Sequence, residues 1–149
     1  MKKDIICVVA QFFLFALFFI DWNFYSYQLP SWLGYIFIFF VVVGLLVVIF
    51  GILSLNVNLS PFPTPRNNAS LISHGIYKHI RHPIYTGIII ALFAYTFYSF
   101  SVFRLIVTLA LVIVFYFKTK LEERLLRERY EKYRDYMRRT GRFLPKINS

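Results

Sequence analysis

The chain has 149 residues, of which 58% are hydrophobic and 21% aromatic, and its formal net charge is +10. This length is typical of a single domain, here residues 1–149. Long apolar runs exclude an ordinary soluble protein and indicate an all-α integral membrane protein. Since the positive charge gathers beside the apolar runs instead of covering a soluble surface, we expect no nucleic acid partner.

Four apolar segments predict about four transmembrane helices, at residues 5–20, 33–53, 84–98 and 105–117. The stretch from Tyr98 to Arg104 separates the last two, which we interpret as a hairpin. The fourth segment corresponds to about 20 Å of helix, whereas the apolar core of a bilayer is about 30 Å thick. This span must therefore tilt, stop short or take length from residues 118–121.

The basic residues predict the orientation in the membrane. If successive loops lie on alternate sides, sixteen of the seventeen Lys and Arg residues fall on one side. By the positive-inside rule, both termini and the loop between the second and third spans are then cytoplasmic. Aromatic residues at a membrane interface fit the opposite loop, around Trp22, Tyr25, Tyr27 and Trp32. The opening MKK could also begin a signal peptide, but no small-residue cleavage site follows, so we expect the first span to be retained.

The loop before the third span is rich in proline. Pro61, Pro63 and Pro65 predict an extended path that cannot continue the second helix. Pro83 suits the first turn of the third span, because a helix needs no N–H donor there. The N-terminus of that helix is slightly positive and favours an anionic ligand.

The C-terminal segment predicts an amphipathic cytoplasmic helix. Leu126, Tyr130, Tyr133 and Met137 recur at spacings that form one stripe, and Gly141 with Pro145 marks the end. The arginines of the other face fit anionic lipid headgroups. The adjacent Glu122 and Glu123 gain nothing from such lipids and need another explanation.

The two polar regions flank one hairpin and should meet at the cytoplasmic membrane surface, as a site for a charged ligand requires. A metal site is disfavoured, because the three histidines, His74, His79 and His82, are too few for a membrane iron oxygenase and lack the spacing of a zinc site. A purely structural role, in which His and Arg side chains bind backbone carbonyls at the interface, stays open.

The motifs SLISHGIYKHIRHPIYTG and EERLLRERYEKYRDYMRRTGRFLP together resemble those of the isoprenylcysteine carboxyl methyltransferase-like group of integral membrane methyltransferases. The resemblance covers roughly residues 59–145, and the preceding SPFPTPRNNASLISHG is similar to prokaryotic members, which implies a prokaryotic plasma membrane. It also implies S-adenosylmethionine as the cofactor, bound by residues of about 59–87 and 118–145.

The resemblance implies roles for individual residues. The implied cofactor-binding set is Ala69, Ser70, Leu71, Ile72, Tyr77, His82, Pro83, Ile84, Tyr85, Glu122 and Glu123. Within it, Glu122 is implied to bind the amino-acid end of the cofactor. Lys118 stands where the family often has an arginine that faces the anionic group of the substrate. Lysine keeps that charge but lacks the bidentate fork of arginine.

The predicted reaction is methyl transfer to a lipophilic acceptor, namely the carboxylate, thiol or amine of a lipid or lipidated molecule. A carboxylate or thiolate needs no general base, whereas for an amine or hydroxyl His82 or Tyr85 would serve. Arg81 belongs to the predicted catalytic set with His82 and Tyr85, and we expect it either to orient its loop or to face phosphate headgroups. One alternative is an NADPH-dependent membrane reductase of the sterol-reductase type, and another is a non-enzymatic membrane scaffold. Cofactor binding separates the three, and the sequence does not define the oligomeric state.

Overall fold

The structure is a computed structural model that describes residues 2–20, 29–55 and 70–146. Within these ranges the fold is all-helical and contains one isolated parallel bridge, between Ile80 and Gly141. The α-helices are α1 (Lys2–Phe19), α2 (Ser31–Leu55), α3 (Pro83–Tyr98), α4 (Val102–Arg129) and α5 (Tyr133–Arg139), and a short 3₁₀ turn η2 (Gly75–Lys78) precedes α3. The predicted all-α class is confirmed.

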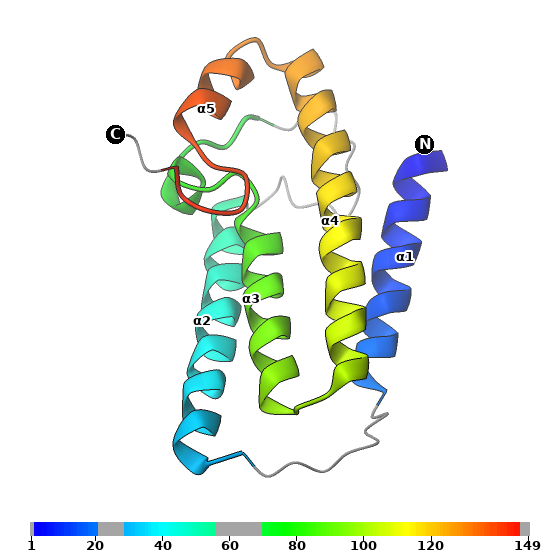
Figure 1. The fold of residues 1–149 in the computed structure, drawn as a ribbon. Coiled ribbons are helices and arrows are strands. Elements are labelled where there is room, and N and C mark those ends of the chain that lie inside the picture. Colours follow the sequence, from blue (N-terminus) through cyan, green and yellow to red (C-terminus); the bar gives the residue numbers. More distant parts are fainter. Residues whose placement is uncertain (1, 21–28, 56–69, 147–149) are drawn as a thin grey trace.

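The four long helices pack as neighbours in the order α1, α4, α3, α2. Figure 1 shows α2 and α3 side by side, with α4 next and α1 on its far side. The predicted hairpin is confirmed as a pair of helices, because α3 ends at Tyr98 and α4 begins at Val102. Ser101 begins α4 by accepting a hydrogen bond from the backbone N–H of Arg104 at 3.3 Å.

Aromatic and aliphatic side chains join α1 to the α3–α4 hairpin. Phe18 of α1 packs with Val107, Leu111 and Phe115 of α4 in the buried core. The Arg104 guanidinium reinforces this end of the bundle, since its Nε donates to the Phe18 carbonyl at 3.3 Å. Arg104 also lies over the Tyr95 ring, 5.3 Å from the ring centre. The arginine that the sequence assigns to the hairpin turn therefore anchors α1 at this end.

Glycines let α2 and α3 approach closely. A Cβ atom at Gly44 would lie 2.6 Å from the Gly87 carbonyl oxygen, and one at Gly87 would lie 2.5 Å from the Gly44 carbonyl oxygen. Farther along α2, a Cβ at Gly51 would meet Ile84 at 2.7 Å. In lipid, the hydrophobic effect does not drive helices together. Their association depends instead on close packing, which small residues at the contact points allow.

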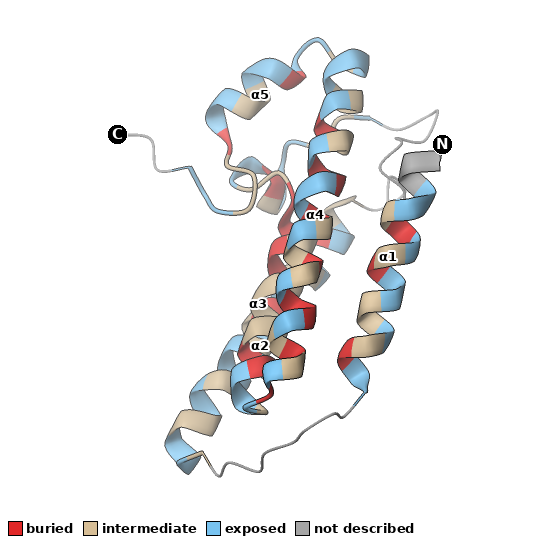
Figure 2. Cartoon of the chain, turned by 45° about the vertical axis from the view of Figure 1, so that its right-hand side comes forward, coloured by how far each residue is buried: buried red, intermediate tan, exposed pale blue. Residues whose placement is uncertain are grey.

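The outer faces of the helices are apolar. Figure 2 shows the buried positions gathered mainly where α3 and α4 meet, whereas α2 presents mostly exposed or partly exposed positions. Only 11% of the most apolar window of α2 is buried, and Leu53 and Tyr35 are 68% and 75% exposed. Such a surface is unfavourable in water, so it indicates association with a membrane.

Two described helices, α2 and α4, are long and apolar enough to cross a membrane, whereas the apolar helices Ile5–Phe19 and Pro83–Tyr98 are shorter. The prediction of about four spans is therefore supported for two helices and stays a prediction for the other two. The helix of the fourth predicted span extends beyond residue 117, and whether the span takes length from residues 118–121 stays a prediction. The helix α4 continues without interruption to Arg129, over 28 residues.

The single amphipathic C-terminal helix predicted from the sequence is wrong. The helix α4 stops at Arg129, Tyr130 is extended with φ −122° and ψ 112°, and α5 begins at Tyr133. The predicted stripe is split, since Leu126 belongs to α4 and Met137 to α5. The physical reason is tertiary packing, which overrides helix propensity here. The break buries the Tyr133 side chain, which is 1% exposed, and turns α5 back toward the loop before α3.

Candidate functional site

The loop before α3 and the segment after α5 pair with each other. The Arg81 backbone N–H donates to the Gly141 carbonyl at 2.9 Å, and the His82 N–H donates to the Arg142 carbonyl at 3.1 Å. In return, the Gly141 N–H donates to the His79 carbonyl at 3.2 Å. Gly141 is required here, because a Cβ atom would collide with the Leu144 backbone. The two polar regions that the sequence predicts to converge are therefore in direct contact (Figure 1).

The Arg81 side chain stabilises this junction between the loop before α3 and the segment after α5. Its Nε donates to Glu123 Oε1 at 2.8 Å, and its terminal nitrogen donates to the carbonyls of Met137, at 3.2 Å, and of Thr140. The Arg81 side chain is 8% exposed. Of the two predicted roles for Arg81, orientation of the loop is therefore the one that the geometry supports, and contact with headgroups is not.

Glu123 is the shared acceptor of three cationic or titratable side chains. Besides Arg81, it accepts from Arg142 through both carboxylate oxygens, and His82 Nε2 lies 3.3 Å from Oε1. The Glu123 side chain is 2% exposed. The hydrogen bond from Arg142 to Glu123 raises the pKa of the Arg142 guanidinium above its ordinary value. This carboxylate therefore ties α4 to the loop before α3 and to the C-terminal segment.

His82 lies between the two carboxylates. It precedes the helix α3, and Pro83 occupies the first turn, as predicted. Because an ionised Glu123 only accepts hydrogen bonds, His82 Nε2 carries the proton that bonds to it. The other ring nitrogen, Nδ1, lies 3.8 Å from Glu122 Oε2. The imidazole also stacks on the Tyr85 ring, with 5.8 Å between the ring centres, so packing and hydrogen bonding fix its orientation.

A cavity of about 260 Å³ opens beside His82. Its lining comes from all four long helices, from η2 and from the loop before α3: Gln11, Leu55, Tyr77, Arg81, His82, Ile84, Tyr85, Ile88, Lys118 and Glu122. Glu122 is 28% exposed toward this space, unlike its neighbour Glu123. The Tyr85 hydroxyl lies 3.5 Å from Glu122 Oε2.

The cavity brings together seven of the residues proposed from the sequence: Tyr77, Arg81, His82, Ile84, Tyr85, Lys118 and Glu122. Pro83 and Glu123 do not line it, although each is next in the chain to a residue that does. Ser70, Leu71 and Ile72 are not part of its lining, and Leu71 lines a second groove instead. Ala69 lies outside the described residues.

Lys118 contributes a cation to the cavity and is itself 1% exposed. Its Nζ donates to Gln11 Oε1 at 2.5 Å and lies 5.3 Å from the centre of the Tyr85 ring. The sequence interpretation did not include Gln11. A polar side chain inside an apolar helix is a general sign of function in membrane proteins, and this signal would have identified it. Arg142 was also missed, because its segment was interpreted only as a helix end.

Two tyrosines join the cavity to α5. The Tyr136 hydroxyl donates to the Tyr77 carbonyl at 2.7 Å. Burial raises the pKa of Tyr136 to about 12. Burial, and then the nearby Glu122 carboxylate, raise the pKa of Tyr77 well above its ordinary value. Both hydroxyls therefore remain protonated at neutral pH and act as hydrogen-bond donors.

The arrangement combines a carboxylate, an ammonium, an imidazole and aromatic faces in one partly enclosed space. Such a set can hold a ligand that carries both positive and negative groups, because each sign of charge finds a counterpart. The apolar side chains of Leu55, Ile84 and Ile88 form the rest of the lining. An amphipathic or lipophilic second ligand therefore has an apolar wall to lie against.

Comparison with known proteins identifies the family. The family model for phospholipid methyltransferases matches residues 30–133, well over half of the chain, including α2, α3, α4 and most of the cavity residues. No curated protein matches the chain. The match agrees with the resemblance carried by the two sequence motifs. The chain therefore belongs to the phospholipid methyltransferase family, a family of enzymes that transfer methyl groups to lipid substrates.

Proposed function

We propose that this protein transfers the methyl group of S-adenosylmethionine to a lipophilic acceptor, and that the cavity beside His82 is the active site. The observation that carries the proposal is that two adjacent carboxylates have different contacts. Glu123 is occupied by Arg81, His82 and Arg142, whereas Glu122 is directed into the cavity. The acceptor is a carboxylate, thiol or amine of a lipid or of a lipidated molecule.

The residues of the cavity fit the proposed cofactor. S-adenosylmethionine carries an ammonium, a sulfonium and a carboxylate, so its site needs groups of both signs. Glu122 would hold the ammonium, and Tyr77, Ile84 and Tyr85 would surround the remainder. Lys118 would bind the anionic group of the acceptor. Glu123 and Arg81 then act as positioning residues, because they hold His82 and the loop in place.

The chemistry supplied by the bound cofactor is an electrophilic methyl group on a positively charged sulfur. The protein excludes water with Leu55, Ile84 and Ile88 and aligns the acceptor with Lys118. Charge is neutralised when an anionic acceptor takes the methyl group, and a dry site favours such a step. Alignment contributes as well, since fixing the reacting groups removes several kcal/mol of entropic barrier.

An amine or hydroxyl acceptor must also lose a proton. His82 is the first candidate for general base, because Glu123 holds its Nε2 and leaves Nδ1 directed toward the cavity carboxylate Glu122. This is the arrangement by which a carboxylate commonly orients a catalytic imidazole. Tyr85 is the second candidate, and its hydroxyl lies 3.5 Å from Glu122 Oε2.

We further propose that all four long helices cross the plasma membrane of a prokaryote, with both termini cytoplasmic. The 16 residues of α3 correspond to about 24 Å of helix, somewhat less than the apolar core of about 30 Å. Local thinning of the bilayer accommodates a mismatch of this size at modest cost. The active site then lies at the cytoplasmic face, within one domain formed by residues 1–149.

A methyl-transfer assay tests the proposed activity. Purified protein is incubated with methyl-labelled S-adenosylmethionine and a bacterial lipid extract, and label is counted in the organic phase. We expect label in the lipid fraction with the wild-type protein and with Glu128→Gln, and strongly reduced label with Glu122→Gln. Binding of NADPH without any methyl transfer would favour the reductase alternative. A folded protein that binds neither cofactor would favour the scaffold.

A further inference from the structure

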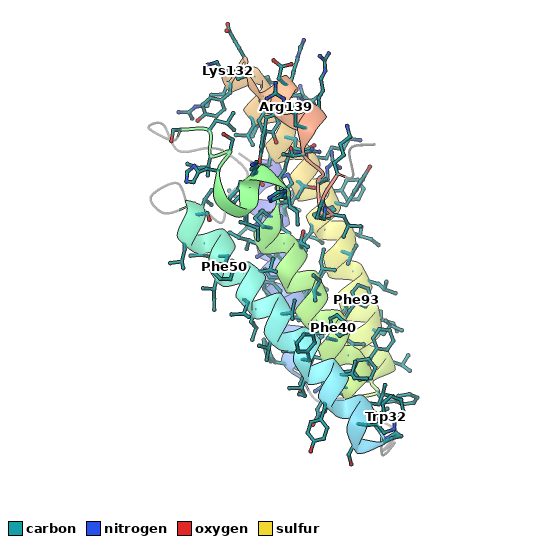
Figure 3. The ribbon with its side chains drawn as sticks, turned by 90° about the vertical axis from the view of Figure 1, so that its left-hand side faces the viewer. Trp32, Phe40, Phe50, Phe93, Lys132 and Arg139 are labelled. Carbon is teal, nitrogen blue, oxygen red and sulfur yellow. The ribbon has the colours of Figure 1, made fainter. Side chains whose placement is uncertain are left out.

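A second groove lies between the η2 region and α5, outside the cavity described above. Its volume is about 810 Å³. Basic side chains from three segments line it, namely Lys78 and His79, Lys132 and Arg139, and Lys146. Figure 3 shows Lys132 and Arg139 at the end of the molecule opposite Trp32, beyond the apolar lengths of the helices.

The positive charge of this groove is largely uncompensated. Asp135 is the single carboxylate in a lining that carries four Lys or Arg side chains. Asp135 also lies 3.8 Å from Arg138, which is not part of the lining, so its charge is shared. Among the described residues, no carboxylate lies within ion-pair distance of Lys78, Lys132 or Arg139. The exposed like charges around this groove create a positive local potential, which attracts anions.

The groove and the cavity beside His82 share no lining residue. The wall between them includes Tyr136, which lines the groove and donates its hydroxyl to the carbonyl of the cavity residue Tyr77 at 2.7 Å. A ligand in the groove therefore does not need to enter the cavity where we place the methyl transfer.

We propose that this groove binds a phosphate-bearing anion. Arg139 offers a planar guanidinium whose donors match phosphate oxygens in pairs. Lys78, Lys132 and Lys146 add compact positive charges, and the Ser73 hydroxyl adds a neutral donor. The chemistry is the same for the headgroup of an anionic phospholipid and for the phosphate of a soluble ligand.

Two probes distinguish a phospholipid headgroup from a soluble phosphate ligand. The purified full-length protein, in a zwitterionic detergent at low salt, is titrated calorimetrically with short-chain phosphatidylglycerol and, separately, with inorganic phosphate. We expect saturable binding of about one phosphatidylglycerol per chain. If inorganic phosphate binds at the same site, a soluble phosphate ligand is the source. If only phosphatidylglycerol binds, the source is a lipid headgroup.

Variants locate the binding. The double variant Lys132→Gln/Arg139→Gln should bind about thirtyfold more weakly, because each cation near an anionic surface contributes about a factor of five. The control Lys120→Gln/Arg134→Gln removes the same charge from exposed positions of α4 and α5 outside the groove, and should change affinity less than threefold. Asp135→Asn should tighten binding severalfold, because it removes the single carboxylate of the lining. A gain in affinity cannot result from a misfolded protein.

Two results would overturn the proposal. One is that neither probe binds, and the other is that the groove variant and the control variant weaken binding equally, which would indicate only general attraction by net charge. Neither measurement needs a methyl donor. The outcome is therefore independent of the proposed methyltransferase activity.

Discussion

Glu122 and Glu123 follow one another in the chain and have opposite surroundings. Glu123 is 2% exposed and accepts hydrogen bonds from Arg81 and Arg142, with His82 Nε2 at 3.3 Å. Glu122 lines the cavity and is 28% exposed. Adjacent helical positions point about 100° apart, so one carboxylate turns toward the loop before α3 while the other turns into the cavity. Geometry thus distinguishes a carboxylate that binds the junction from one that lines the cavity.

The first prediction concerns the stability of the junction. Glu123→Gln leaves Arg81 and Arg142 without their counter-charge in a buried setting, where breaking an ion pair costs roughly 3–5 kcal/mol. We expect a markedly lower midpoint of thermal unfolding in detergent. Glu128→Gln, at an exposed position 60% accessible to solvent, should change the free energy of unfolding by less than about 0.5 kcal/mol. Equal midpoints for the two variants would contradict the structural role of Glu123.

At the scale of elements, the second prediction tests the glycine contact between α2 and α3. In Gly44→Ala the new Cβ would lie 2.6 Å from the Gly87 carbonyl oxygen and 2.7 Å from the Ala91 nitrogen. Both are backbone atoms, so the helices must separate, at a cost of about 1–3 kcal/mol.

Gly34→Ala in the same helix is the matched control. Its Cβ would meet only the Tyr98 ring, at 3.6 Å, which is an ordinary contact. We expect this variant to unfold at the wild-type temperature or above it, since alanine favours helix. If both variants unfolded at the wild-type temperature, the close approach of α2 and α3 would be refuted.

Much of this architecture could be predicted from the sequence. The apolar runs gave the long helices, Pro83 gave the start of α3, and the stretch from Tyr98 to Arg104 gave the hairpin. The break between α4 and α5 could not be predicted, because residues 130–132 contain neither glycine nor proline and the helical stripe continues through them. Only the burial of Tyr133 and the contacts of α5 with the loop before α3 decide it.

Most of the residues that line the cavity could also be predicted from the sequence. The motifs identified the residues that line the cavity from η2, α3 and α4, since these lie close together in the sequence or match the family resemblance. They did not identify Gln11, which reaches Lys118 from a helix 107 positions away. The resemblance assigned Glu122 to the cofactor, but the motifs did not show that Arg81, His82 and Arg142 all contact Glu123.

At the scale of the whole molecule, the ends of the bundle differ in character. One end carries η2, α5 and the N-terminal end of α1, and the other carries the hairpin between α3 and α4 (Figure 1). Most of the basic residues gather at the first end, which predicts that it faces the cytoplasm.

The third prediction tests that orientation in intact cells. Single cysteines are introduced at Phe100, which is 52% exposed in the hairpin, and at Lys132, before α5, in a Cys7→Ser background. A maleimide that cannot cross membranes should label Phe100→Cys directly and Lys132→Cys only after permeabilisation. Labelling of both positions in intact cells would show that the two ends share one side of the membrane, against the proposed topology.

The central claim is that Glu122 holds the methyl donor, and calorimetry of S-adenosylhomocysteine binding tests it most directly. Glu122→Gln keeps the shape of the side chain and removes its charge, so affinity should fall by about 1.5–3 kcal/mol, the range for a hydrogen bond to a charged group. Glu128→Gln, farther along α4, should bind as the wild type does. If a folded Glu122→Gln protein bound S-adenosylhomocysteine with unchanged affinity, the cavity beside His82 would not be the cofactor site.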